Sequence, residues 1–137
     1  MPPDPRRVAD TRAWFRKAQI DLRGAQIDLA ADPPLLEDVV FHCQQAAEKT
    51  LKGFLTWHDR PFRKTHDLGE LGQQCTQRDP LLEPVCRRAE PLTVYAWVFR
   101  YPGPTEEPSR REAEDAMTVA GELLQTVLAR LPEELRL

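Results

Sequence analysis

The sequence predicts an all-α protein, a four- to five-helix up-and-down bundle in a single domain. Three observations lead to this prediction. Apolar residues recur every three or four positions over most of the 137 residues, which is the spacing of one helix face. There is no convincing alternation of apolar and polar residues, and no Asn-Gly or Asp-Gly pair that would mark a hairpin turn. The length suits one domain whose core is shared by four or five packed helices.

The first two helices are predicted from their apolar faces and from the turn between them. Residues 1–9 form an N-terminal tail, and a first helix covers about residues 10–31. The segment "DPP" ends that helix, because proline cannot continue it. Asp32 is expected to cap the second helix with Pro33 at its first position, and this helix runs over about residues 34–58. The first helix turns these residues to one face: Trp14, Phe15, Ala18, Leu22, Ala25 and Leu29.

The next part of the chain is predicted as a basic loop followed by two shorter helical stretches. The segment "DRPFRK", residues 59–64, forms the loop, and Thr65 in "THDLGEL" caps a short third helix. A fourth helical stretch covers about residues 79–95. Pro84 and Pro91 are expected to make it begin late or bend, because proline removes a helix hydrogen bond and clashes with the preceding turn.

The last helix has a clear start. The segment "RYPGPTEEP", residues 100–108, is a loop because of its prolines and glycine. Ser109, followed three residues later by Glu112, is a capping box that opens the final helix. The helical domain therefore covers residues 10–131, and residues 132–137 form a frayed C-terminal tail.

Composition and charge exclude several classes of protein. The net charge of −3 gives no broad electrostatic attraction to nucleic acid or to an anionic membrane. The start of the chain has no apolar leader segment, and the longest apolar run, "TVYAWVF", is far shorter than the roughly 20 residues of a membrane span. The odd number of cysteines, without Cys-x-x-Cys spacing, favours buried thiols in a reduced compartment: Cys43, Cys75 and Cys86. We therefore expect a cytoplasmic protein without membrane contact.

The first helix contains an internal repeat, "AQIDLRG AQIDLAA", in which five residues recur seven positions apart. A seven-residue spacing keeps equivalent residues on almost the same face. Ile20 and Ile27 therefore share a second face, which either contacts another helix of the bundle or forms the seam of a homodimer. Asp21 and Asp28 also share a face. They could suggest paired carboxylates for a metal, but the flank of an amphipathic helix explains them more simply, and no metal or cofactor is predicted.

The second helix carries polar residues where its core face should be apolar. Gln44 lies within the apolar stripe, Glu48 lies at its edge, and Lys52 follows one turn later. A buried carboxylate requires a cation and hydrogen-bond donors. One hypothesis is that Glu48 meets Arg100 between helices, with Gln44 in the same network. The alternative is that Glu48 pairs only with Lys52 at the surface, which is a favourable order for residues four apart.

Four segments in this order carry a family resemblance: "AQIDLRGA", "FHCQQAAEKTLKGFL", "KTHDLGEL" and "YAWVFRYPG". The chain resembles a HEPN domain (higher eukaryotes and prokaryotes nucleotide-binding) of the stand-alone prokaryotic kind, over roughly residues 10–130. The resemblance implies a four- or five-helix bundle that is commonly a homodimer. It also implies a partner, because such chains are often encoded beside a minimal nucleotidyltransferase and act with it as a toxin–antitoxin-like pair. Many HEPN domains are metal-independent ribonucleases.

The ribonuclease idea directs attention to arginine and histidine. Cleavage of RNA without a metal requires an acid or base and a cation for the charged phosphorane. Catalytic members of the family are similar in one motif, in which an arginine is followed after four to six residues by a histidine, usually around the start of a late helix. In this chain no histidine follows Arg100. The only segment with that spacing is "RPFRKTH", where Arg60 precedes His66 by six positions and Arg63 and Lys64 add positive charge. His66 is expected in the first turn of the third helix.

Three interpretations of this segment remain open. In the simplest, Thr65 caps a helix and the basic loop is merely solvated. In the second, Arg63, Lys64 and His66 contact the phosphate of a nucleotide or RNA, together with Arg100 and Tyr101. In the third, His66 and an arginine of the loop form a ribonuclease site, completed across a dimer by Arg100 and Tyr101. The other two histidines, His42 and His58, are assigned no role.

Overall fold

The computed structural model describes residues 2–103 and 106–136. The predicted tails and loop also include four residues that lie outside the described part: Met1, Pro104, Thr105 and Leu137. Within the described part the protein is all-helical, with five α-helices, three 3₁₀ helices and no strand, so the predicted fold class is confirmed. In chain order the elements are α1 (Pro5–Ala30), α2 (Leu36–Trp57), α3 (Leu68–Arg78), η1 (Pro80–Leu82), α4 (Glu83–Ala89), η2 (Glu90–Ala96), α5 (Arg110–Ala129) and η3 (Glu133–Leu135).

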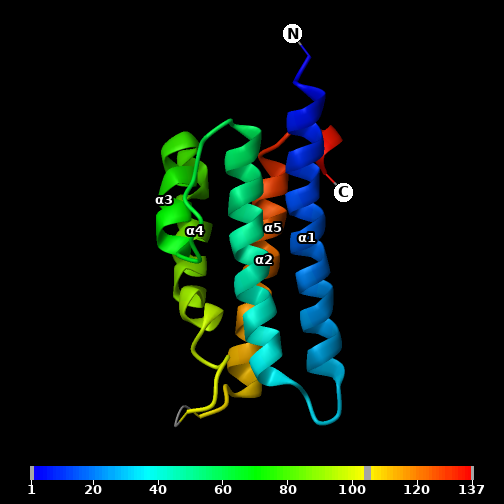
Figure 1. Ribbon diagram of the computed structural model, residues 1–137, viewed down its shortest axis with the longest axis vertical. Helices are drawn as coiled ribbons and strands as arrows, with labels where there is room; N and C mark the ends of the chain where they lie inside the picture. The colour runs from blue at the N-terminus through cyan, green and yellow to red at the C-terminus, as the bar shows by residue number, and fades with distance from the viewer. Residues whose placement is uncertain (1, 104–105, 137) are drawn as a thin grey trace.

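The helix α2 is the centre of the bundle. It contacts α1, α3, α5 and η2, and Figure 1 shows α1 on one side of it and the α3–α4 pair on the other. The two termini lie at the same end of the bundle (Figure 1). The core is a single cluster to which all five α-helices contribute, and its largest fully buried side chains include Phe15, Leu51, Phe54 and Leu123. None of the helices in the described chain is both long enough and apolar enough to cross a membrane.

The first helix begins five residues earlier than predicted. Asp4 occupies the N-cap position, and its side chain accepts a hydrogen bond from the backbone N–H of Arg6 at 2.9 Å. Pro5 takes the first helical position, where its missing N–H costs nothing. The sequence signals for this start were Asp4 followed by Pro5, and Val8, which packs against the core seven residues before Phe15. Most of the predicted tail 1–9 is therefore helix.

The turn between the first two helices also differs from the prediction. Asp32 does not cap α2, and Pro33 is not its first residue. Both lie in the turn, where their peptide bond is cis. Leu35 occupies the N-cap position without a side-chain hydrogen bond, and its N–H donates to the carbonyl of Asp28 at 2.9 Å. The two prolines are used to reverse the chain rather than to start the helix.

The loop after α2 runs back along that helix before α3 begins (Figure 1). Asp67, rather than Thr65, caps α3, because its carboxylate accepts from the N–H groups of Gly69 and Glu70. Thr65 Oγ1 instead accepts from the N–H of Asp67 at 3.0 Å. His66 therefore precedes the helix, and the prediction that it lies in the first helical turn is wrong.

The fourth helical stretch was predicted to begin late or bend at its prolines, and its α-helical part does begin late, at Glu83, between two 3₁₀ helices. The α-helical part, α4, has Pro84 at its start, and Pro91 opens the 3₁₀ helix η2. The predicted capping box of α5 is confirmed, since the Ser109 and Glu112 side chains each bond the other's backbone N–H.

The C-terminal segment is more ordered than predicted. Leu135, in η3, is fully buried in the core. The guanidinium of Arg136 donates to three backbone carbonyls at and just beyond the end of α5, those of Leu128, Ala129 and Leu131. Carbonyls at a helix end lack the amide partner of the next turn, and of these three the carbonyl of Leu128 also accepts from the N–H of Leu131 at 3.1 Å. The described part of the predicted frayed tail is therefore fixed to the bundle.

The α1–α2 contact depends on a glycine. A Cβ atom on Gly53 would lie 2.9 Å from Cε1 of Phe15 and 3.1 Å from Cβ of Trp14, whereas one on Gly121 of α5 would meet nothing within 4 Å. We expect Gly53→Ala to lower the free energy of unfolding by about 1–3 kcal/mol through overpacking. Gly121→Ala should raise it by about 0.5–1 kcal/mol, because alanine favours the helix. Urea denaturation of both variants measures this, and similar shifts in both would contradict the close packing.

Candidate functional site

The carboxylate of Glu48 is buried between α2 and the loop that follows it. Its side chain is 7% exposed. Oε1 lies 2.6 Å from Nδ1 of His66, and Oε2 accepts from Nζ of Lys52 at 2.9 Å. Gln44 Nε2 also donates to Oε1, at 3.3 Å. A buried carboxylate without such partners would be strongly destabilising, so these contacts explain how Glu48 is tolerated.

Gln44 ties the helix to the loop. Its Nε2 donates to the backbone carbonyl of His66 at 3.0 Å, in addition to its bond to Glu48. Its Oε1 accepts from Nε2 of Gln45 at 2.7 Å. Both ends of this fully buried amide are therefore satisfied. The amide in the apolar stripe of α2 holds the backbone of the loop at His66.

Lys52 closes the network on the side of α1. Its ammonium lies 5.8 Å from the ring centroids of both Trp14 and Phe62, close enough for a cation–π interaction. Those two rings meet edge to face, with centroids 6.1 Å apart. Because the Lys52 side chain is only 10% exposed, its charge is used to balance Glu48 rather than to attract a ligand.

His66 is the exposed member of the network, with a side chain that is 62% exposed. Because an ionised carboxylate only accepts hydrogen bonds, the contact with Glu48 places a proton on Nδ1 of His66. Nε2 forms no hydrogen bond with any residue that the structure describes. The carboxylate thus fixes the orientation of the ring and leaves Nε2 free for a ligand. Nε2 accepts a hydrogen bond in the neutral ring and donates one to an anion when both ring nitrogens are protonated.

The hypothesis that Glu48 pairs with Arg100 is wrong. The guanidinium of Arg100 lies 3.8 Å from the ring centroid of Phe41, and no ion pair joins it to Glu48 within the described chain. Phe41 lies seven residues before Glu48 on α2, which is about 10 Å along the helix axis. The alternative, a surface pair of Glu48 with Lys52 alone, is also wrong, since both side chains are buried and His66 is a second partner.

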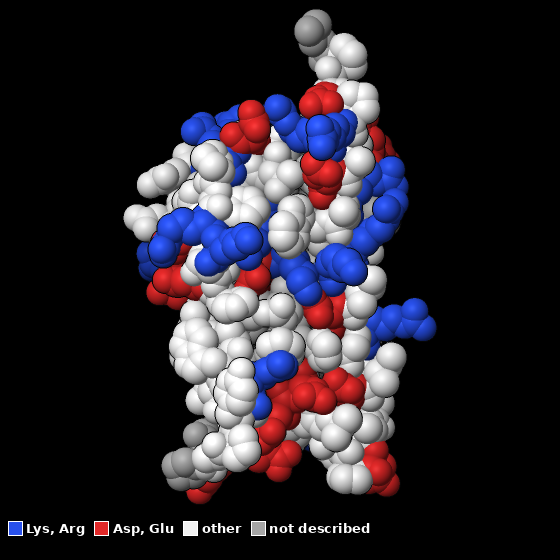
Figure 2. All heavy atoms as spheres, in the orientation of Figure 1, with Lys and Arg blue, Asp and Glu red and all other residues white. Residues whose placement is uncertain are grey.

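The other predicted ligand residues, including Tyr101, are exposed, and no hydrogen bond or ion pair joins any of them to the ring of His66 within the described chain. Arg63 is bound to Glu70, with three donor–acceptor distances of 2.7–3.2 Å, and this hydrogen bonding raises the pKa of Arg63. Arg60 lines a separate hollow with Arg78, and Lys64 forms no ion pair with a described residue. In Figure 2, Lys and Arg are more prominent than Asp and Glu over the upper half of the face, where Figure 1 places this loop and the first half of α1.

A second polar cluster, between α1 and α2, was missed by the sequence analysis. Asp21 accepts from Nζ of Lys49 at 2.5 Å and lies 3.0 Å from Nδ1 of His42. Nε2 of His42 lies 3.7 Å from Asp28. The prediction that Asp21 lies on a solvated flank is wrong, because it is 8% exposed. The sequence did contain a signal for this cluster. Asp21 and Asp28 are seven residues apart on α1, and His42 and Lys49 are seven residues apart on α2.

Neither metal binding nor a reactive cysteine finds support in the described residues. No group of three or more His, Cys, Asp or Glu residues is placed to hold a metal ion there. All three cysteines are free and buried. Burial raises the pKa of Cys43 to about 12 and that of Cys86 to about 11, so these thiols are not ionised at neutral pH.

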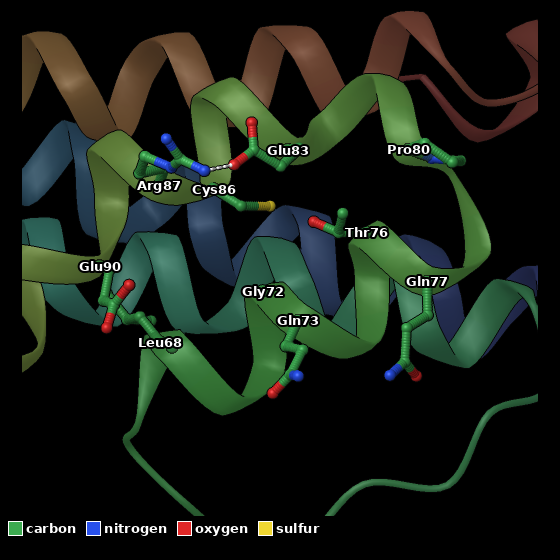
Figure 3. A pocket seen from close by; sticks show the side chains of 11 residues that line it. Leu68, Gly72, Gln73, Thr76, Gln77, Pro80, Glu83, Cys86, Arg87 and Glu90 are labelled. Atoms are coloured by element: carbon green, nitrogen blue, oxygen red, sulfur yellow. Dashed lines mark ion pairs between the residues drawn. The ribbon is translucent and has the colours of Figure 1, made fainter.

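A hollow between α3 and α4 lies apart from these residues (Figure 3). Gly72 and Cys86 form part of its lining, and a Cβ on Gly72 would lie 3.2 Å from Cβ of Cys86. Glu83 and Arg87 form an ion pair at its edge (Figure 3). None of the predicted ligand residues lines it, so we place the candidate site at His66.

The comparisons with known proteins give one positive result. A family model, described as HEPN domain, matches residues 11–133. No curated protein and no solved structure matches the chain. The match begins within α1 and extends past the end of α5.

Removal of the buried carboxylate tests the network. Glu48→Ala leaves the ammonium of Lys52 buried without its partner, and we expect a loss of about 3–5 kcal/mol in the free energy of unfolding. Glu114→Ala is a matched control, because Glu114 forms an exposed ion pair with Arg110 on α5 and should change stability by less than about 0.5 kcal/mol. An unchanged melting temperature for Glu48→Ala would show that the carboxylate is not buried.

Proposed function

Since the chain belongs to the HEPN domain family, we propose that it binds the phosphate of a nucleotide or RNA at His66 and pairs with a minimal nucleotidyltransferase. The pair would act as a toxin–antitoxin-like system in the cytoplasm. The observation that supports phosphate binding is the buried carboxylate of Glu48, which holds an exposed histidine with its second ring nitrogen directed away from the network.

The chemistry of the surrounding loop suits an anion. Lys64 is exposed and forms no ion pair with a described residue, so its charge is available to a phosphate. Arg63 is bound to Glu70, but this pair is exposed and a phosphate could replace the carboxylate at small cost. The N-terminus of α3 does not contribute, because Asp67 already accepts from the N–H groups of Gly69 and Glu70. Binding would therefore depend on side chains of the loop.

The proposed partners rest on the family and on exposed apolar side chains. Stand-alone prokaryotic HEPN chains commonly form homodimers and are often paired with a nucleotidyltransferase. Five large apolar side chains of the described chain are more than half exposed. Leu81 is one of them, and the other four lie in two pairs, Ile20 and Ile27 on α1 and Trp97 and Tyr101 near the start of the loop before α5. Exposed apolar side chains that gather at one place favour contact with another protein.

A second candidate function is a metal-independent ribonuclease. The observation that favours it is the same Glu48–His66 contact, because catalytic histidines are commonly oriented by a carboxylate on one ring nitrogen while the other exchanges protons. Arg60 or Arg63 would supply the cation. Arg100 and Tyr101 could join such a site only from a second subunit, since Arg100 of the same chain lies against Phe41.

The binding proposal can be tested with single-stranded RNA that carries a 5′ fluorescent label. The fluorescence anisotropy of this RNA, measured in EDTA as protein is added, reports binding. His66→Ala and Lys64→Ala should each weaken binding by roughly tenfold, because each removes a charge-assisted contact to phosphate. Arg111→Ala, which removes an exposed charge on α5, is the control and should have little effect. Equal losses in all three variants would indicate non-specific attraction and contradict a site at His66.

The same samples separate binding from cleavage when they are analysed on a denaturing gel. The binding proposal expects intact RNA with the native protein. Fragments that disappear in His66→Ala would favour the ribonuclease instead. Fragments of equal yield in the native protein and in His66→Ala would remove the ribonuclease interpretation.

The pairing proposal makes a separate prediction. The neighbouring reading frame should encode a small protein with the Gly-Ser and paired-Asp motifs of a nucleotidyltransferase. When the two proteins are co-expressed with a tag on one of them, they should co-purify and elute together in size-exclusion chromatography. Failure of that protein to bind would contradict the pairing and leave the phosphate site untouched.

A further inference from the structure

The outer face of α1 carries an apolar stripe that no described element covers. Ile20 and Ile27 are 61% and 60% exposed, and Gly24 lies between them. Their spacing of four and three residues places them on one side of the helix. The opposite side of α1 packs on α2 and α5, and Figure 1 shows α1 at the edge of the bundle.

Charged residues of opposite sign flank this stripe. Arg16 and Arg23 lie on one side of it, and Asp21 and Asp28 lie on the other, since successive residues turn by about 100° around the helix. Neither arginine forms an ion pair with a residue that the structure describes. Asp21 is already bound to Lys49, whereas Asp28 has only the 3.7 Å contact with His42. The pair with unused charge is therefore Arg23 and Asp28.

We propose that α1 packs in parallel against α1 of a second copy, crossing near Gly24, with Arg23 of each copy beside Asp28 of the other. In a parallel helix pair with contacts at positions 20, 24 and 27, a residue on one side of the stripe faces a residue of the other copy that lies five positions later in the sequence, on the other side of the stripe. Arg23 and Asp28 are five apart. The geometry is self-complementary, as a two-fold dimer requires.

The charges exclude the antiparallel arrangement of the same stripe. In that arrangement each side of the stripe faces the same side of the other copy. Arg23 would then lie beside arginines, and Asp28 would lie beside aspartates, which is unfavourable in both cases. The second copy is also a better occupant than a protein of unrelated sequence, because this chain supplies both members of the complementary charge pair.

Gly24 and Lys17 set the extent of the contact. Gly24 has no side chain to keep the backbones apart, and a Cβ there would lie 3.5 Å from Nε2 of His42 on α2, so a helix that crosses at Gly24 also passes this ring. Lys17 occupies the preceding position of the stripe, where two copies would bring like charges together, so the helices must diverge there. The seam is therefore a short crossing rather than a long coiled coil.

This inference deepens the homodimer of the proposed function and rests on it. Cysteine cross-linking of the full chain tests the parallel arrangement, because a two-fold axis along the helix places Ile20 of one copy beside Ile20 of the other. We expect Ile20→Cys to form a disulfide-linked dimer under mild oxidation on a non-reducing gel. The three native cysteines are buried and should not interfere. Gln26→Cys is exposed on another side of the same helix and should remain monomeric on the gel.

A charge exchange tests the register. Arg23→Glu should weaken the dimer by about tenfold in sedimentation analysis, and Arg23→Glu combined with Asp28→Arg should restore it. No restoration in a double variant with a native circular dichroism spectrum would overturn the register.

The outcomes separate the seam from the homodimer. A native chain that light scattering shows to be monomeric at micromolar concentration would overturn both. A native dimer in which Ile20→Cys does not cross-link would overturn the seam and leave the homodimer standing. A dimer that is unaffected by Ile20→Ser and Ile27→Ser, while binding of the nucleotidyltransferase is lost, would assign this face to that partner and overturn the proposal.

Discussion

The structure depends on one buried charge, the carboxylate of Glu48 on the central helix α2. A carboxylate removed from water costs several kcal/mol unless a cation and hydrogen-bond donors replace the solvent. Lys52 supplies the cation from the next helical turn, while Gln44 and His66 supply donors. Because one of these donors lies in the loop after α2, satisfying Glu48 also fixes the course of that loop. The position of the exposed histidine is therefore a consequence of the core.

The two histidine–carboxylate contacts of α2 are alike in chemistry but differ in what they leave available. His42, towards α1, has a carboxylate near each of its ring nitrogens, those of Asp21 and Asp28. Its Nδ1 hydrogen-bonds Asp21 at 3.0 Å and so joins α1 to α2, while Nε2 has only the longer 3.7 Å contact with Asp28. His66, towards the loop, has one ring nitrogen on Glu48 and the other without a partner among the described residues. The same pairing thus serves a structural role on one side of α2 and can serve a functional role on the other.

The sequence predicted the elements better than their contacts, and the reason is physical. Helix faces, the capping box at Ser109 and the breaks at Pro84 and Pro91 are local features, so they could be recognised from neighbouring residues. The polar position of Glu48 in its stripe indicated that a buried partner was needed. Which residue that partner would be depends on how a distant loop packs, and neither spacing nor charge determines this. Arg100 had the right charge, but Phe41 offered its guanidinium an aromatic face two helical turns away.

The distribution of charge around His66 favours binding over cleavage in a single chain. A metal-independent ribonuclease needs a cation close to the histidine to stabilise the phosphorane. Lys52 is buried and balances Glu48, and Arg63 is bound to Glu70. Arg60 lies beside Arg78 at a separate hollow, so Lys64 is the remaining free cation of the loop. The free charge of Lys64, two residues before the oriented His66, agrees with the proposed binding of phosphate, whereas stabilising a transition state would require a further positive charge from a second subunit or a partner protein.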